Sequence, residues 1–396
     1  MLPFVTEISY VTLLLLGFIA TCASLYSIML ARRFDCRVLE SLARRRFGFQ
    51  PNVCVVMPCK GDEPNLERNI NALLKLNYHS YHVIIVTDSE NDPAYRLANT
   101  VLRTSAGPKT ELIVSIQHSN ASGKVSALLT ALEKDKGNAE VYAFIDSDST
   151  IHNAWLTDLV DPLGDATVGS TTGFRWYFAT GFWSEVQSAW NASGSNLMFD
   201  DRYNFPWGGA MALRAETLHR IRVDKVWRDA VSDDLTLNTA LRRFGYHTLF
   251  LPQCTVVTFT KNLTRSTFLK WATAQTALTR TYHHKLWNYA LMAYTFFNVT
   301  FVFGLVAIIL GFLYTPSWFI PATLLLVQTP LGAFRSLSRN ATFERALPWM
   351  SHEFKVSLRG ILAGLIVPWI MTYCIFKSIF IHEIEWRGRS YSLRKV

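Results

Sequence analysis

The sequence is poor in charged residues: Asp, Glu, Lys and Arg together make up 17% of the 396 residues, whereas soluble domains contain about 25%. Hydrophobic residues make up 50%, which excludes an intrinsically disordered chain. The mean hydropathy of +0.15 is high for a cytosolic enzyme and low for a transporter made only of membrane spans. We therefore expect a membrane protein that carries a sizeable soluble domain.

The sequence also lacks the patterns of several other protein classes. Its six cysteines include no CxxC pair, so we expect buried free thiols rather than a disulfide framework or a structural zinc site. No helix-turn-helix, zinc-finger or RNP pattern is present, so no nucleic-acid partner is expected. The net charge of +9 instead suits anionic lipid headgroups or phosphorylated substrates.

Apolar runs near both ends of the chain are long enough to cross a bilayer, which takes roughly 20 residues. Residues 10–31 carry no charge and are followed by arginines, which mark the cytoplasmic flank of a span that runs from outside to inside. Further apolar runs cover residues 289–314, 318–334 and 361–380, and the second of these holds two prolines that predict a broken or re-entrant helix. Because the C-terminal tail is basic, we expect one C-terminal segment not to cross fully.

Between these runs, β-rich apolar segments alternate with amphipathic helical segments, which predicts a doubly wound α/β domain. The expected strands are 54–58, 82–88, 111–116 and 141–148. We place an N-terminal transmembrane helix with its basic flank at 1–35, a cytoplasmic α/β domain at 36–285, and a C-terminal membrane region of two or three spans with a basic tail at 286–396. Residues 343–359 are expected to form an amphipathic helix along the membrane interface.

Acidic residues follow the expected strands, at the edge where parallel α/β sheets bind ligands. Asp146 and Asp148 follow the fourth strand in the segment DSDS, and two such carboxylates can hold a divalent cation that bridges a diphosphate. Asp88 follows the second strand and can accept hydrogen bonds from a base or ribose, although helix capping is a competing interpretation. Lys124 opens an expected helix and can meet a phosphate there, the alternative being a solvated surface lysine.

Two later segments add candidate groups. SDDLTL places Asp233 and Asp234 at the start of an expected helix, where an ionised acid can act as general base for a hydroxyl nucleophile. Plain helix capping is the competing interpretation. WGGAMALR places Gly208 and Gly209 directly after Trp207, which would let the backbone pass close to a ligand.

The last segment, TFLKWATA, places Lys270 and Trp271 just before the apolar run at 289–314. A cation beside an aromatic ring suits phosphate contact and sugar stacking.

Taken in order, the motifs resemble family 2 inverting glycosyltransferases with a GT-A fold, and most closely the membrane-embedded, ceramide glucosyltransferase-like branch. The resemblance covers residues 50–275 and rests on MPCKGDEPNLERNI, YHSYHVIIVTDSENDPA, GKVSAL, DSD, WGGAMALR and SDDLTL, with a similar tail, IEWRGRSY.

The resemblance implies a GT-A, Rossmann-like α/β domain and a donor site. In that site Asp88 would contact the uridine and Lys124 would meet the nucleotide or its diphosphate. Asp146 and Asp148 would hold the ribose side and the metal-bound diphosphate, with Mn²⁺ or Mg²⁺ as the cofactor.

The resemblance also implies a catalytic base, Asp234, with Asp233 beside it. The residues expected on the acceptor side or at the diphosphate are Trp207, Gly208, Gly209, Lys270 and Trp271. The family motif at the last two positions is Gln/Arg-x-x-Arg-Trp, but this sequence reads TFLKW. Because lysine does not replace arginine in a bidentate phosphate contact, the departure argues against processive polymer synthesis.

The reaction implied by the resemblance is metal-assisted transfer of a sugar, glucose in the first instance, with inversion. The donor would be a UDP-sugar and the acceptor the hydroxyl of a lipid such as ceramide, a diacylglycerol or an isoprenoid lipid, at the cytoplasmic face of the membrane. Two alternatives stay open: a processive polysaccharide synthase of the chitin or hyaluronan kind, and a sugar-nucleotide-binding membrane protein without catalysis.

Overall fold

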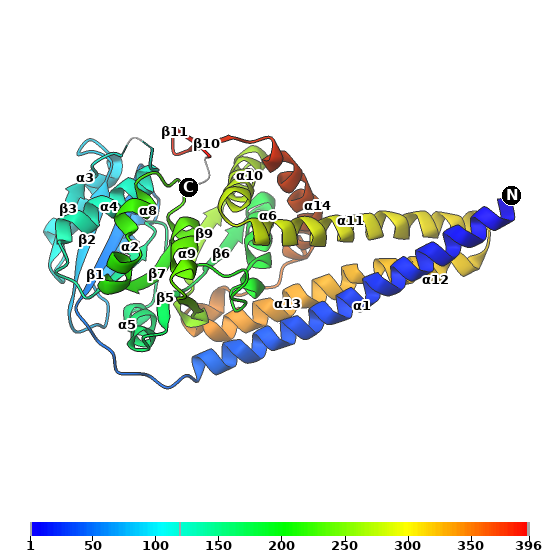
Figure 1. Ribbon diagram of the computed structural model, residues 1–396, viewed down its shortest axis with the longest axis horizontal. Coiled ribbons are helices and arrows are strands. Elements are labelled where there is room, and N and C mark those ends of the chain that lie inside the picture. The colour runs from blue at the N-terminus through cyan, green and yellow to red at the C-terminus, as the bar shows by residue number, and fades with distance from the viewer. Residues whose placement is uncertain (1, 119, 394–396) are drawn as a thin grey trace.

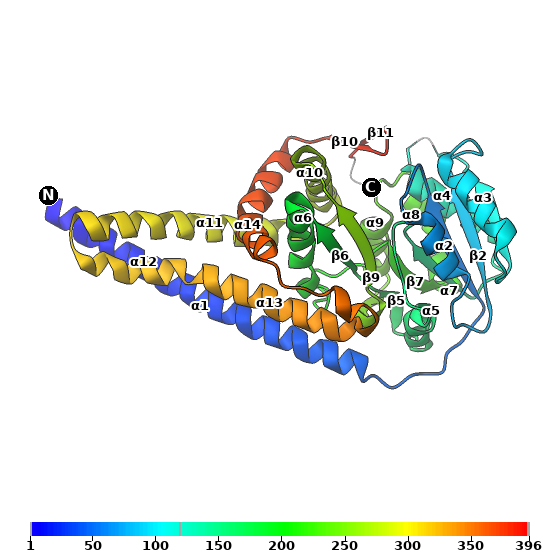
Figure 2. The same cartoon turned by 180° about the vertical axis from the view of Figure 1, so that it is seen from behind.

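The computed structural model describes residues 2–118 and 120–393. It consists of an α/β domain and a set of long helices that project from one side of this domain (Figures 1 and 2). The predicted architecture, an α/β domain with apolar helices on both sides of it in the sequence, is confirmed.

A seven-stranded sheet forms the centre of the α/β domain, in the order β3-β2-β1-β4-β7-β5-β8. All of its strands are parallel except β7, which runs antiparallel to both of its neighbours, β4 and β5. The strands are β1 (Val53–Cys59), β2 (Tyr81–Thr87), β3 (Thr110–Val114), β4 (Val141–Ile145), β5 (Val168–Thr172), β7 (Ala210–Arg214) and β8 (His247–Phe250). The four strands expected from the sequence are present as β1 to β4.

Helices cover both faces of this sheet. Successive side chains of β1 enter opposite cores, since Val55 packs in one hydrophobic cluster and Val56 in the other, as the two-residue period of a strand requires. The helices of the domain are α2 (Leu66–Leu73), α3 (Pro93–Thr104), α4 (Gly123–Asp135), α5 (Trp155–Val160), α6 (Phe182–Ser193), α7 (Ala215–Arg220), α8 (Val223–Trp227), α9 (Asp233–Arg243) and α10 (Arg265–Tyr282).

A second, two-stranded parallel sheet lies between the main sheet and the long helices. It pairs β6 (Arg175–Thr180) with β9 (Val256–Lys261). A bridge between Thr150 and Val257 joins β9 to the loop that follows β4. This connection brings the start of β6 next to the carboxyl end of the main sheet.

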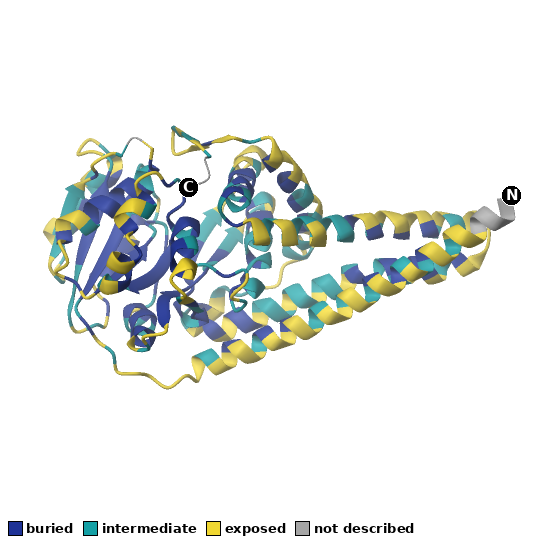
Figure 3. Ribbon diagram, viewed as in Figure 1, coloured by how far each residue is buried: buried dark blue, intermediate teal, exposed yellow. Residues whose placement is uncertain are grey.

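Four helical segments are long and apolar enough to cross a membrane. They comprise α1 (Leu2–Leu42), α11 (His284–Leu313), the pair α12 (Phe319–Leu326) and α13 (Gln328–Ala346), and α14 (Leu358–Ile379). The break expected in the segment 318–334 occurs at Val327, between α12 and α13. Many residues of the projecting helices are exposed (Figure 3), and large apolar residues such as Phe18, Ile309 and Phe312 are among them.

The fourth apolar helix, α14, lies where the projecting helices meet the α/β domain (Figure 1). It packs on α6 and α10 of that domain and also on α11, to which it is joined by hydrogen bonds from Asn298 Nδ2 to the Pro368 carbonyl and to Thr372 Oγ1. The amphipathic helix expected at 343–359 was a wrong prediction: this segment contains the end of α13, a 3₁₀ turn at Pro348–Glu353 and an extended stretch before α14. Pro348 explains the stop, because proline cannot continue an α-helix.

After α14 the chain returns to the α/β domain. It ends in an antiparallel hairpin of β10 (Glu383–Trp386) and β11 (Arg389–Ser392). The hairpin lies beside the carboxyl ends of the main-sheet strands (Figure 1).

Candidate active site

A large cavity, of about 2270 Å³, lies at the carboxyl edge of the main sheet. The aspartates that follow β2 and β4 and those that open α9 all line it, because these elements end or begin at the same edge. The predicted site residues that line it are Asp88, Lys124, Asp146, Asp148, Trp207, Asp233, Asp234 and Trp271. The structure therefore brings together motifs that are widely separated in the sequence.

Lys124 connects three of these motifs. Its Nζ lies 2.8 Å from Asp146 Oδ1 and 3.1 Å from Asp233 Oδ2, and it donates a hydrogen bond to the Gly208 carbonyl at 3.1 Å. Burial alone would lower the pKa of Lys124, but the surrounding carboxylates raise it above its ordinary value. The lysine is therefore a fixed positive charge at the centre of the site.

The two glycines of WGGAMALR allow the carboxylates to approach the backbone. A Cβ on Gly208 would lie 2.0 Å from Asp233 Oδ2, and one on Gly209 would lie 2.1 Å from the Trp207 ring and 2.6 Å from Asp146 Oδ2. A side chain at Gly208 would therefore displace the Asp233 carboxylate, and one at Gly209 would displace the Trp207 ring and the Asp146 carboxylate. The sequence predicted that the backbone passes close to a ligand at these glycines, and in the structure it passes close to the carboxylates of Asp233 and Asp146.

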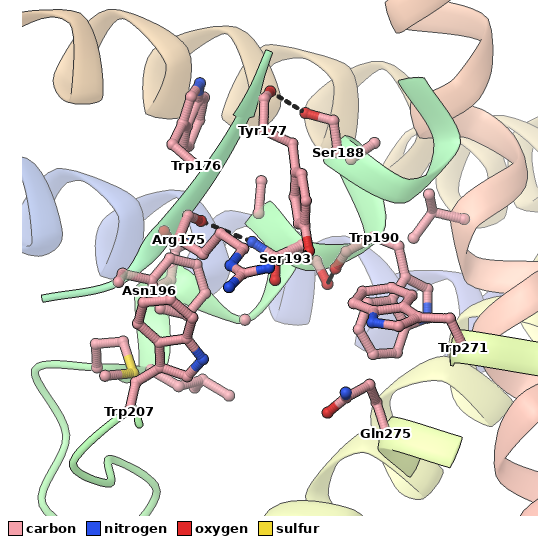
Figure 4. Close-up of a pocket in the computed structure, with 18 of the residues that line it drawn as sticks. Arg175, Trp176, Tyr177, Ser188, Trp190, Ser193, Asn196, Trp207, Trp271 and Gln275 are labelled. Atoms are coloured by element: carbon pink, nitrogen blue, oxygen red, sulfur yellow. Dashed lines mark hydrogen bonds between the residues drawn. The ribbon is translucent and has the colours of Figure 1, made fainter. Parts of the chain in front are cut away.

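Arg175, which sequence reasoning missed, pairs with both carboxylates of the DSD segment. Its guanidinium donates to Asp148 at 2.7 and 2.8 Å and to Asp146 at 2.8 Å, and it lies 4.9 Å from the centroid of the Trp207 ring (Figure 4). Burial alone would raise the pKa of Asp146, but Lys124 and Arg175 lower it. Asp146 is thus held as an anion.

Asp146 and Asp148 fit a divalent cation by their chemistry, because carboxylate oxygens are the ligands that Mg²⁺ and Mn²⁺ prefer. Both side chains are partly exposed to the cavity, by 23% and 21%. Glu63 lies nearby, and burial together with the negative charge of Asp148 raises the pKa of its carboxyl group. Arg175 supplies the positive charge that this acidic group requires, and a cation would share or take over that role.

A second group of possible metal ligands lies elsewhere. Cys54, His82 and Asp135 bring one ligand atom each to within 4.8 Å of one another, near the beginnings of β1 and β2 and thus at the edge opposite the cavity. Asp135 already accepts hydrogen bonds from Tyr142 at 2.7 Å and from the Ala139 amide at 3.0 Å. Its other oxygen lies 2.7 Å from His82 Nε2. We therefore interpret this group as a hydrogen-bonded polar cluster of the core.

Asp88 is paired with two basic residues from distant parts of the chain. Its Oδ2 lies 2.6 Å from Lys60 Nζ and 3.0 Å from Arg389 Nη2. Arg389 belongs to the C-terminal hairpin, and the neighbouring Tyr391 hydroxyl accepts a hydrogen bond from the Gly123 amide at 3.1 Å. The hairpin therefore covers the end of the cavity where Asp88 and the first turn of α4 meet.

Asp233 and Asp234 occupy different environments although they are adjacent. Burial, together with the negative charges of Asp234 and Asp146, raises the pKa of Asp233 to about 6, despite the opposing effect of Lys124. Asp234 accepts hydrogen bonds from Ser232 Oγ and from the Leu235 amide, both at Oδ1. Among the described residues, its Oδ2 has no hydrogen-bond partner and is available to a ligand in the cavity.

An aromatic wall faces these acids from α6 and α10. The Trp190 and Trp271 rings lie 5.0 Å apart, and Gln275 follows one turn after Trp271 on the same face of α10 (Figure 4). Lys270 is exposed and is not among the residues that line the cavity. The structure thus brings Trp271 into the site but not Lys270, which the one-residue step of about 100° along a helix explains.

The cavity continues from the acids to the apolar helices. Residues of α1, α11, α13 and α14 line its far end, among them Ser27, Phe297, Gly332, Gly364 and Pro368. The same cavity therefore offers a charged end on the α/β domain and a largely apolar end among the apolar helices.

A mixed, mainly parallel sheet with paired acids at its carboxyl edge fits the GT-A class of glycosyltransferases, and the family match supports this class and sugar transfer from a nucleotide sugar. The chain belongs to glycosyl transferase family 21, whose model matches residues 12–396. The class expected from the sequence is confirmed, whereas the family number differs from the family 2 that the resemblance suggested.

Two solved structures are similar to this chain at low sequence identity. A mannosyltransferase from Pyrobaculum calidifontis, solved with GDP-Man and Mn²⁺, is 16% identical with a TM-score of 0.50, over 93% of this chain and 99% of that one. A glucosyl-3-phosphoglycerate synthase from Mycobacterium tuberculosis, solved with Mn²⁺, UDP and phosphoglyceric acid, is 16% identical with a TM-score of 0.33, over 53% of this chain and 68% of that one.

Proposed function

We propose that this protein transfers a hexose, glucose in the first instance, from a UDP-sugar to a hydroxyl group of a membrane lipid, with inversion at the anomeric carbon. The observation that carries the proposal is the continuous cavity between the acids of the α/β domain and the apolar helices. A water-soluble acceptor would have no need of the apolar end, whereas a lipid can place its headgroup at the acids and its chains among the helices. Ceramide is the acceptor that the sequence resemblance implies.

The proposed chemistry is a single displacement. Asp234 takes the proton of the acceptor hydroxyl through its free Oδ2, while the acceptor oxygen bonds to the anomeric carbon and the bond from that carbon to the diphosphate breaks. Lys124 holds a positive charge beside the departing diphosphate. Asp146 and Asp148 would hold a divalent cation, which would supply further neutralisation of that diphosphate.

Charge also supports an orientation for the membrane-bound protein. Arg33 and Arg37 lie on α1 at its junction with the α/β domain, and Arg44, Arg45 and Arg46 follow the helix. Because basic residues mark the cytoplasmic flank of a span, we place the α/β domain (36–285) in the cytoplasm, between the anchor at 1–35 and the membrane region at 286–396. In this arrangement we also propose that α14 lies at the membrane surface without crossing it fully, as the basic tail predicts.

The test uses purified full-length protein with Mn²⁺, a panel of radiolabelled sugar nucleotides and a panel of lipids that includes ceramide, dioleoylglycerol and an isoprenoid alcohol. Label that extracts into organic solvent, and only when both donor and lipid are present, is the expected result. Label in a long water-soluble chain would instead establish a polysaccharide synthase. Donor binding without any transfer would establish a non-catalytic protein.

A further inference from the structure

The C-terminal hairpin of β10 and β11 carries the tail segment IEWRGRSY, to which the proposed reaction assigns no role. The hairpin is a two-stranded sheet of its own, and an isolated hairpin is marginally stable without support. Its support comes from α10, because Ile384 is buried in a cluster with Ala274 and Ala277. Arg280 of the same helix donates a hydrogen bond to the Ile381 carbonyl at 2.6 Å. The base of the hairpin is therefore fixed on one wall of the cavity.

The tip of the hairpin is a two-residue turn, Arg387 and Gly388, between the paired residues Trp386 and Arg389. Both turn residues have positive φ, 47° for Arg387 and 76° for Gly388, as a type I′ turn requires. Asparagine, aspartate or glycine is the usual first residue of this turn, because other residues rarely adopt the left-handed backbone. The turn alone therefore does not explain why an arginine stands at its tip.

The Arg387 side chain extends from the tip to the loop that follows β1, and it lines the cavity. Its Nη1 donates a hydrogen bond to the Lys60 carbonyl. Its Nη2 lies 3.7 Å from Glu63 Oε2, and the side chain is 41% exposed. This second distance is too long for a hydrogen bond. Because a guanidinium carries several N–H donors, most of those of Arg387 remain available to a ligand in the cavity.

The charge of Arg387 acts on the acids at the carboxyl edge of the main sheet. Burial and the negative charge of Asp148 raise the pKa of Glu63, and Arg387 opposes this rise. Burial alone would raise the pKa of Asp146, but basic residues lower it, with Lys124 first and Arg387 among them. The tip of the hairpin therefore brings a further positive charge to the acids that would hold the cation and the diphosphate.

The rest of the hairpin lies over the neighbouring part of the donor site. Arg389 pairs with Asp88 at 3.0 Å, and the Tyr391 hydroxyl accepts a hydrogen bond from the Gly123 amide. These contacts lie where the sequence resemblance implies the nucleoside, whereas Arg387 lies beside the acids expected at the diphosphate. The hairpin therefore runs along the expected donor, with Arg387 at the phosphate that is farther from the nucleoside.

We propose that Arg387 binds the diphosphate of the sugar nucleotide, at the phosphate farther from the nucleoside, and that the hairpin thereby closes over the bound donor. A guanidinium suits this role because its paired N–H donors match the geometry of phosphate oxygens. The diphosphate would then lie between Arg387 of the hairpin and Lys124 of α4. This inference rests on the proposed nucleotide-sugar donor and does not depend on the acceptor.

The experiment measures binding of UDP and of UMP, each with Mn²⁺, by calorimetric titration of the full-length protein in dodecyl maltoside micelles. The two ligands share the nucleoside and differ in the second phosphate. The variants are Arg387→Asn, the charge-keeping Arg387→Lys and the control Arg359→Gln, an exposed arginine of α14 that does not line the cavity. Asparagine suits the first position of a type I′ turn, so Arg387→Asn removes the guanidinium and keeps the hairpin. Melting temperatures report whether each variant remains folded.

We expect UDP to bind the wild type and Arg359→Gln equally, and to bind Arg387→Asn at least roughly ten-fold more weakly. Arg387→Lys should be intermediate, because it keeps the charge but not the paired donors. UMP should bind all four proteins within about two-fold, and Arg387→Asn should melt no lower than the wild type. Equal UDP binding by Arg387→Asn and the wild type overturns the inference. Equal weakening of UDP and UMP also overturns it, because the effect would then lie at the nucleoside.

The same titrations with GDP and GMP separate this inference from the proposed function. A wild type that binds GDP in place of UDP would contradict the proposed UDP-sugar donor, and the GDP and GMP series would then test Arg387 in the same way. Because binding is read without sugar transfer, a protein that binds the diphosphate through Arg387 and transfers no sugar would contradict the proposed reaction and support the inference.

Discussion

The two ends of the cavity differ in how their charges are compensated. At the donor end, Asp88, Asp146, Asp148 and Asp233 each lie within 3.1 Å of a lysine or arginine nitrogen. At the membrane end, Arg335 and Arg339 face Tyr289, Tyr294 and each other, with no carboxylate among these neighbouring groups of the described residues. The first end therefore holds its charges in place before a substrate arrives, whereas the second has a local excess of positive charge.

This difference is informative about the substrates. A nucleotide sugar brings both a charged diphosphate and, with it, a cation, so the donor end must carry groups of both signs. The predictions below test the compensated end by removing its members in turn.

The largest effect is expected for Asp234→Asn, which removes the proposed proton acceptor and changes the side chain little in size. Loss of a general base costs roughly 10²–10⁴-fold in rate, so the transfer rate constant should fall by that factor. Donor affinity, measured by calorimetric titration of UDP with Mn²⁺, should change less than about three-fold, corresponding to roughly 0.6 kcal/mol. Turnover at the wild-type rate would remove Asp234 from this role.

Next in size is Arg175→Gln, which leaves Asp146 and Asp148 facing each other without their shared guanidinium. Removing one partner of a buried ion pair costs about 3–5 kcal/mol, and the Arg175 side chain is only 13% exposed. We expect a clear fall in the melting temperature, partly reversed by Mn²⁺, and a larger Mn²⁺-induced rise than in the wild type. The control is Arg202→Gln, whose pair is exposed and should contribute about 0–1 kcal/mol; equal melting temperatures for the two variants would contradict this account.

The donor end shows how far sequence reasoning reaches. Asp88, Asp146 and Asp148 could be placed because they follow parallel strands, whose carboxyl ends must meet at one edge. Arg175 could not, since it begins a strand of a separate sheet that no local pattern ties to the DSD segment. The only sequence signal for such a residue was chemical. Clustered carboxylates need positive charges beside them, and Lys124 alone supplies only one.

The membrane end was less predictable for a related reason. The apolar runs predicted the helices, but hydropathy could not show that α14 packs on α6 and α10 of the α/β domain as well as on α11. Lys270 illustrates the reverse case. It is adjacent in sequence to Trp271, which lines the cavity, but Lys270 itself does not line it.

A smaller effect is expected from Arg389→Gln in the C-terminal hairpin. Arg389 pairs with Asp88 and is 36% exposed, so the pair should be worth about 0–1 kcal/mol, which corresponds to at most about a five-fold change in affinity. We expect KM for the donor to rise within that range with kcat unchanged, because the hairpin touches the nucleotide end and not the reacting atoms. Arg359→Gln, an exposed change on α14, should alter neither constant, and a fall in kcat alone for Arg389→Gln would rule out a role for the hairpin in donor binding.

The smallest expected effect is the pH dependence of stability that Asp233 causes. Its pKa rises from 3.8 to about 6 on folding, so the folded chain binds the proton more tightly than the unfolded chain. Stability from this group is therefore fully present below pH 3.8 and is lost as the pH rises through 6, which amounts to about 1 kcal/mol between pH 5 and pH 7. Asp233→Asn should remove this component, so that the difference in melting temperature between wild type and variant shifts by a few degrees in favour of the wild type at pH 5. Melting curves that change in parallel with pH for the two proteins would show that Asp233 titrates as an ordinary surface carboxyl, and that the donor end compensates its charges less tightly than its geometry indicates.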